Sequence, residues 1–198
     1  MTKVKVIVAV AALALWGCTS YHDVVKEYPQ YLINNQGASH LPTTSAASNY
    51  TMTPATQTHH YEFRSRQAGG RNVWVVEFGR LLEHTLESRD VQGAFGRLTR
   101  AGANDPRADL LVFDLQRYEF VDMGAHVALK VSHVRQGVEV FTRIYQADGD
   151  TQGGKMFWGG AYAMQNAVHQ STKHAVDEIL RRLIADLNAS GRAAARNP

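Results

Sequence analysis

The first seventeen residues constrain this chain most, because they have the layout of an export signal. Lys3 and Lys5 precede an apolar run from Val6 to Trp16, which the small residue Gly17 follows. A positive start, a short apolar run and a small residue at its end are the three parts of a secretory signal peptide. The run is too short for a membrane-spanning helix, which needs about 20 apolar residues. We therefore predict that residues 1–17 are a signal peptide and are removed.

The next residue, Cys18, is the only cysteine in the chain and cannot form an internal disulfide. Its place after Leu15, Trp16 and Gly17 resembles a bacterial lipobox. That resemblance implies cleavage before Cys18 and lipidation of its thiol. Two or more acyl chains hold a protein stably on a bilayer. Thr19 stands where an aspartate would retain the protein at the inner membrane, so we expect an outer-membrane lipoprotein that faces the periplasm. The alternative is an ordinary signal peptide, or a buried N-terminal strand, with an incidental cysteine.

The charge of the mature chain gives little support to a nucleic-acid partner. The whole sequence carries 21 basic and 18 acidic residues, a formal net charge of +3. Removing Lys3 and Lys5 with the signal peptide leaves 19 basic residues and a net charge of +1. A nearly neutral domain lacks the strong positive field that attracts polyphosphates. The remaining length suffices for one domain with its own core.

Residues 18–58 are predicted to form the lipidated N-terminus and a flexible tether. No Asp, Glu, Lys or Arg occurs from Tyr28 through Tyr61, and residues 35–58 are rich in Ser, Thr, Asn, Gln and Ala. Such a composition buries too little apolar surface to offset the entropy of an ordered chain. Deleting residues 35–58 is therefore expected to leave the unfolding of the domain nearly unchanged. An irregular surface loop is the alternative.

Residues 59–190 are predicted to form an α+β domain, followed by a disordered tail over 191–198. Alternation and short turns favour strands at 59–66, 73–76, 90–100, 109–121, 125–134 and 138–145. In the last of these, Val138, Val140 and Ile144 are placed on one face. Three- and four-residue spacing of apolar side chains predicts helices over 77–88 and 163–189. Together these elements predict a four- or five-stranded, mainly antiparallel sheet with two helices packed on one face.

The order of several of these features resembles a known family. Trp74 precedes a helix with Leu81 and Leu82, a strand follows at Ala108 to Val112, and a long helix ends near Leu187. This arrangement, with the lipobox, resembles the ABC-type transport auxiliary lipoproteins, the group that includes paraquat-inducible protein C. The resemblance implies a non-catalytic auxiliary component of an ABC/MCE-type lipid transport system. Its partner would be an MCE-domain or other periplasmic transport protein, with homo-oligomers possible.

A second interpretation is a periplasmic lipoprotein that regulates an envelope enzyme such as a peptidoglycan synthase. A third, an oligomeric secretion channel, would need additional membrane-spanning strands, for which the sequence has no spare hairpin.

Catalytic and metal-binding motifs are missing from the sequence. His59 and His60 are neighbours on a predicted strand and would point to opposite faces. His169 and His174 are five residues apart on a helix, and H-E-x-x-H, G-x-S-x-G and the Walker A pattern do not occur. We therefore predict that the protein is not an enzyme and binds no metal or cofactor.

Aromatic residues near the starts of the two predicted helices are the candidate partner-binding site. Aromatic side chains are enriched in the cores of protein interfaces. Packing within the domain's own core is the alternative. The candidate residues are Trp74, Phe78, Phe157, Trp158 and Tyr162.

Overall fold

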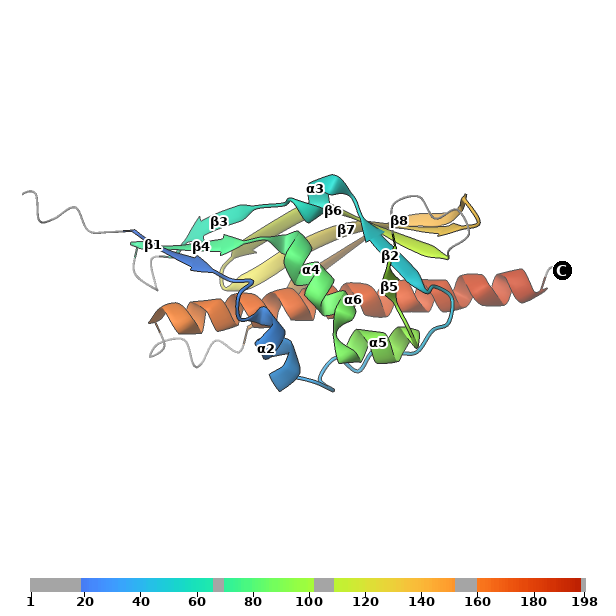
Figure 1. Cartoon of the computed structure of the whole chain (residues 1–198), viewed down its shortest axis with the longest axis horizontal. Helices are drawn as coiled ribbons and strands as arrows, with labels where there is room; N and C mark the ends of the chain where they lie inside the picture. The colour runs from blue at the N-terminus through green and yellow to red at the C-terminus, as the bar shows by residue number, and fades with distance from the viewer. Residues whose placement is uncertain (1–18, 66–69, 102–108, 152–159, 197–198) are drawn as a thin grey trace, which may run out of the picture.

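Three long antiparallel strands form the centre of the computed structural model (Figure 1), which describes residues 19–65, 70–101, 109–151 and 160–196, without the side chains of 192–196. They are β6 (Leu110–Val121), β7 (Gly124–Arg135) and β8 (Val138–Gly149). Positive φ angles at Asp122 and Met123, and again at Gln136 and Gly137, form the two turns between them. Such two-residue turns match the right-handed twist of a hairpin. The predicted meander is confirmed.

Two shorter strands extend this sheet, and a second sheet stands beside it. β2 (Asn49–Met52) lies parallel between β5 (Thr99–Arg100) and β6, which gives the order β5-β2-β6-β7-β8. The second sheet has the order β1-β4-β3, from β1 (Ser20–Asp23), β3 (Tyr61–Arg64) and β4 (Asn72–Val76). The predicted α+β class is confirmed, with two sheets in place of one.

A single long helix covers the inner face of the larger sheet. α6 (Gly160–Arg196) runs along β7 and β8 (Figure 1). The helix backbone lies so close to the strand that a Cβ on Gly149 would stand 1.7 Å from the carbonyl oxygen of Ser171. The predicted helix over 163–189 is confirmed. It continues past Ser190 to Arg196, so the predicted tail is wrong for residues 191–196.

The second predicted helix is also present, and three short helices surround it. α4 (Phe78–Glu87) buries the apolar residues that predicted it, and α2 (Tyr28–Asn34) and α3 (Pro54–Gln57) lie against it. A Cβ on Gly79 would stand 2.3 Å from the carbonyl oxygen of Thr56. Only glycine therefore allows α3 and α4 to approach this closely.

The predicted strand over 90–100 is wrong for most of its length. Residues Arg89–Phe95 form helix α5, and only Thr99–Arg100 is extended. Val91, Ala94 and Phe95 are buried at helical spacing, which is the pattern that the strand prediction overlooked. Gly96, with φ 71°, ends the helix in a conformation that suits glycine.

The predicted tether is wrong for the described part of residues 18–58. This segment contains β1, α2, β2 and α3, and it buries Val24, Tyr28 and Tyr50 completely. β2 has a hydrogen-bonded strand on each side within the larger sheet. The domain therefore begins near Ser20 rather than at His59.

Hydrogen bonds explain why a polar segment with little apolar surface is ordered here. The side chain of Ser39 donates to Asp90 at 2.8 Å, and Thr44 N–H donates to the carbonyl of Ala94 at 2.8 Å. On the other side, the Asn188 amide donates to the carbonyl of Thr43 at 2.9 Å. The segment is thus bound to both α5 and α6 by partners that lie far away in the sequence. Composition alone cannot predict such partners.

This correction predicts that Tyr50 is essential for stability. Tyr50→Ala removes a fully buried ring from β2, whereas Tyr21→Ala changes a ring that is 66% exposed. Losing a large buried aromatic side chain costs about 3–5 kcal/mol of unfolding free energy, and an exposed substitution costs less than about 0.5 kcal/mol. Denaturant unfolding of both variants measures the difference. Small, equal losses would contradict the packing described here.

Candidate interaction surface

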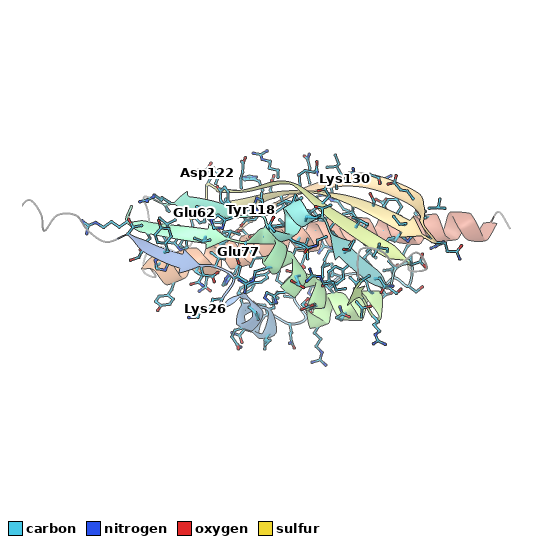
Figure 2. The ribbon with its side chains drawn as sticks, turned by 45° about the horizontal axis from the view of Figure 1, so that its top comes forward. Lys26, Glu62, Glu77, Tyr118, Asp122 and Lys130 are labelled. Carbon is cyan, nitrogen blue, oxygen red and sulfur yellow. The ribbon has the colours of Figure 1, made fainter. Side chains whose placement is uncertain are left out.

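Trp74 and Phe78 are core residues and do not form an exposed patch. Both are fully buried. The Trp74 ring stacks on Phe63 with centroids 5.5 Å apart, and the Phe78 ring lies 5.1 Å from that of Tyr118. The first contact lies within the smaller sheet, and the second joins α4 to Tyr118 on β6, which is labelled in Figure 2. The prediction that Trp74 and Phe78 bind a partner is therefore wrong, and core packing, the alternative, holds for them.

The other predicted site residues have different positions. Tyr162 lies in the first turn of α6 and is 74% exposed. Its exposed environment therefore differs from that of the buried residues Trp74 and Phe78. Phe157, Trp158 and the predicted lipidation site Cys18 lie outside the described residues.

Large apolar side chains are exposed at two distant places on the larger sheet. Val121 pairs with Gly124 at one end of β7, and Val138 pairs with Arg135 at its other end. At about 3.3 Å per residue, these ends are roughly 36 Å apart. The exposed large apolar residues of the described chain are Tyr21, Ile33, Val121, Val138, Val140, Ile144 and Tyr162.

The second place, here named the β8 surface, consists of Val138, Val140 and Ile144 with the neighbouring groove. The sequence placed these three on one face of a sheet that has one solvated face; all three are exposed, whereas Tyr145 and Ala147 are buried. Ile144 pairs with Lys130 on the outer side of the sheet, whereas a register shift between His133 and Val134 separates it from Val138, which pairs with Arg135. Such bulges reorient the side chains of a strand.

The groove beside β8 has a volume of about 690 Å³ and combines charged with apolar groups. Arg143 forms an ion pair with Asp186 at 2.7 Å, and the Tyr145 hydroxyl donates to the same carboxylate at 2.7 Å. Burial, together with Asp186, raises the pKa of Tyr145, so this hydroxyl stays protonated and acts as a donor. Arg182 donates to the Gln146 carbonyl at 3.0 Å. These groups can bind a protein segment by shape and hydrogen bonds.

The rest of the outer side of the larger sheet is mainly polar. Lys130 and Asp122 lie along it (Figure 2), and Ser132 shares a hydrogen bond with Thr142 there at 2.5 Å. This side has the solvated character that alternation predicts for an antiparallel sheet.

A buried polar network holds α6 against the N-terminal segment. Lys173 contacts Asp177 and the side-chain oxygen of Ser39, each at 2.5 Å. Burial raises the pKa of Asp177, although Lys173 opposes the shift. Burial also raises the pKa of Asp90, but hydrogen bonds from Gly37 and Ser39 outweigh it and lower the pKa overall. An unpaired buried charge destabilises a fold. Because these charges are paired, the network can stabilise the contact between α6 and the N-terminal segment.

His169 joins the same two parts of the chain. Its Nε2 donates to the Val24 carbonyl at 2.6 Å, and its Nδ1 is buried without a partner among the described residues. Burial lowers the pKa of His169, although the Val24 carbonyl and Glu27 oppose the shift. The neutral ring is therefore the form that stabilises the fold.

Two other kinds of feature are absent from the described part of the chain. Its His, Cys, Asp and Glu side chains form no group of three that could hold a metal ion. Within the same residues, no helix has both the length and the apolar character needed to span a bilayer.

Comparisons with known proteins give no family for this chain. No family model matches the sequence, and no curated protein matches it significantly. Among solved structures, a Xanthomonas campestris protein described as DUF330 is similar over 80% of this chain and 92% of its own. The identity is 13% and the TM-score 0.45. Similarity at this level assigns neither a fold nor a function to the chain.

The sequence did not indicate the β8 surface as a site. Val138, Val140 and Ile144 have the alternation of an ordinary strand, and the register shift beside Val138 and Val140 depends on pairing with β7. The exposure of Tyr162 likewise depends on where α6 begins. Neither feature has a local sequence pattern of its own.

The environment of His169 predicts a pH-dependent stability. An unfolded histidine takes up a proton near pH 6.5, whereas the buried ring takes one up only at lower pH. Stability should therefore fall as the pH drops from about 7 to 5, since the unfolded state then binds more protons. His169→Gln should reduce this slope by up to about 1.4 kcal/mol per pH unit.

His174→Gln is the matched control, because His174 is exposed on the same helix. Its effect on the slope should be smaller than that of His169→Gln when unfolding free energies are measured between pH 5 and 8, because no buried ring is removed. An equal effect of both substitutions would contradict the assignment to the buried ring.

Proposed function

We propose that this chain is an outer-membrane lipoprotein that serves as a non-catalytic auxiliary component of an ABC/MCE-type lipid transport system. It is attached to the membrane through lipidated Cys18 and binds a periplasmic partner protein. The arrangement of a lipobox-like start followed at once by a folded α+β domain supports this proposal.

The observation that carries the proposal is the exposed β8 surface. It begins near the middle of β8 with Ile144 and continues to Val138, at the end of the sheet opposite Val121. Apolar residues flanked by Arg143 and Arg182 have the composition of interface cores, in which arginine is enriched and apolar area is concentrated. A domain attached to the membrane near one end presents this surface toward the periplasm.

The order of the elements that carry the family resemblance also supports the lipid-transport role. Trp74 lies on β4, Leu81 and Leu82 lie on α4, and Leu110 to Val112 of the predicted strand begin β6, whereas Ala108 lies outside the described residues. The long α6 then closes the domain. This sequence of strand, helix, meander and final helix is the one on which the resemblance rests.

Photocrosslinking in intact cells tests the proposal. A photoreactive amino acid at Ile144 should capture an MCE-domain component of a transport system, identified by mass spectrometry. Ile33 is the matched control, since it is 56% exposed against 54% for Ile144 but lies on α2. Capture at Ile144 and not at Ile33 is expected.

Two results would contradict the proposal. Capture of a peptidoglycan synthase at Ile144 would support a regulator of an envelope enzyme instead. Equal capture of the same protein at Ile33 and Ile144 would show that β8 is not the binding surface.

A further inference from the structure

The point at which the chain joins its predicted lipid lies very close to a strand. Ser20 is the first residue of β1 and pairs with Asn72 on β4. Only Thr19 separates it from Cys18. At no more than about 3.6 Å per residue, the Cα atoms of Cys18 and Ser20 are at most roughly 7 Å apart. Because residues 19–58 are packed into the domain, no long tether can move this end away from the bilayer.

One exposed apolar side chain lies on β1 itself, and a second lies at the turn after β6. Tyr21 and Arg64 flank Val73 in one row of paired residues. A groove of about 280 Å³ leads from Phe63 and Arg64 to the turn after β6, where it is lined by Val121, Asp122 and Met123. The rings of Phe63 and Phe120 lie 4.8 Å apart and hold the two sheets together at this end. Tyr21 and Val121 are 66% and 45% exposed.

A third group comes from the start of α6. The Gln165 side chain donates to the carbonyl of Asp23, the last residue of β1, at 3.4 Å. Tyr162 lies one helical turn before Gln165, toward the end at which β1 begins, and is 74% exposed. Figure 1 shows the starts of β1 and α6 at the same end of the molecule. This end, here named the anchor end, consists of Tyr21, Val121, Met123 and Tyr162.

We propose that the anchor end is a second contact with the membrane, a protein surface that rests on the phospholipid bilayer beside the lipidated cysteine. Tyrosine rings are favoured at the membrane interface, where the ring is apolar and the hydroxyl is hydrated. Exposed Arg64 and Arg71 can interact with lipid phosphates, and Asp122 is the acidic group at the turn. The contact fixes how the domain stands on the membrane and directs β8 away from it.

A bilayer is the occupant that the geometry favours over a protein. Three of the seven exposed large apolar residues of the described chain are Tyr21, Val121 and Tyr162, at the end where β1 begins two residues after the attached lipid. A surface already held there gains contact with lipid at little additional entropic cost. The inference rests on the proposed lipidation of Cys18.

Depth-dependent quenching tests the contact with the full lipidated protein. Lipidation blocks the Cys18 thiol, so a newly introduced cysteine is the single site for a fluorophore. Val121→Cys and Val138→Cys are matched, because both replace exposed valines at opposite ends of β7. Tyr162→Cys is a second variant at the anchor end, on α6. The labelled proteins are reconstituted into vesicles of phosphatidylethanolamine and phosphatidylglycerol that contain a quencher on the acyl chains.

The fluorophores at positions 121 and 162 should be quenched several-fold more by the lipid-borne quencher than the one at 138. Equal quenching at all three positions would overturn the membrane contact. Shielding of 121 and 162 from aqueous iodide without quenching by lipid would also overturn it, and would indicate a second copy or another protein as the occupant.

Intact mass of the mature protein separates this inference from the proposed function. A mass with the diacylglyceryl group, combined with equal quenching, would refute the anchor-end contact alone. A mature chain without lipid would refute the anchor and the contact together. Lipid on Cys18 with selective quenching at 121 and 162 supports both.

Discussion

The structure depends on the insertion of the N-terminal segment between the larger sheet, α5 and α6. β2 supplies a strand between β5 and β6, and the carbonyl of Val24 accepts a hydrogen bond from His169 on α6. Lys173 and Asp90 converge on Ser39 from α6 and α5. Without this segment, β6 would lose its parallel neighbour, and a buried lysine and aspartate on α6 would lose a hydrogen-bonding partner. Removing a hydrogen-bonding partner from a buried charge lowers the stability of the fold.

The sequence predicts best where the pattern is long and local. The β6–β8 meander and α4 follow from the spacing of their own apolar residues, and periodicity predicts residues 163–189 of the 37-residue α6. The N-terminal segment was misassigned because its order comes from partners such as Ala94 and Asn188, far away along the chain. Helix α5 is not predicted although Val91, Ala94 and Phe95 have helical spacing, because the segment is short, contains Gly93 and ends at Gly96.

The candidate surfaces were harder to predict than the fold, for a related reason. Large aromatic side chains contribute strongly to the stability of protein cores and of interfaces alike. Sequence alone therefore does not distinguish these two roles for Trp74 and Phe78. Their burial depends on Phe63, Tyr118 and Phe120, which arrive from other strands. The exposure of Val138 and Val140 lies beside a register shift between two strands, and that shift is a property of pairing rather than of either strand.

The packed N-terminal segment also changes how the proposed lipid anchor would act. A long tether would let a domain explore the periplasm, whereas the short connection from Cys18 to β1 would hold it against its own membrane. The larger sheet and α6 then form a rigid body that separates the anchor end from the β8 surface. The distance from the membrane to a bound partner would then be set by the length of the domain rather than by a tether.

Amide hydrogen exchange tests most directly whether residues 19–58 belong to the folded domain. The amides of Val24, Asn49 and Thr53 donate to backbone carbonyls of Val75, Asp109 and Phe113 at 3.0–3.1 Å. If the segment is integral, these amides should exchange as slowly as the paired amides of β6 and β7, through large-scale unfolding. Exchange at the rate of an unstructured peptide, while β6 and β7 stay protected, would contradict the account.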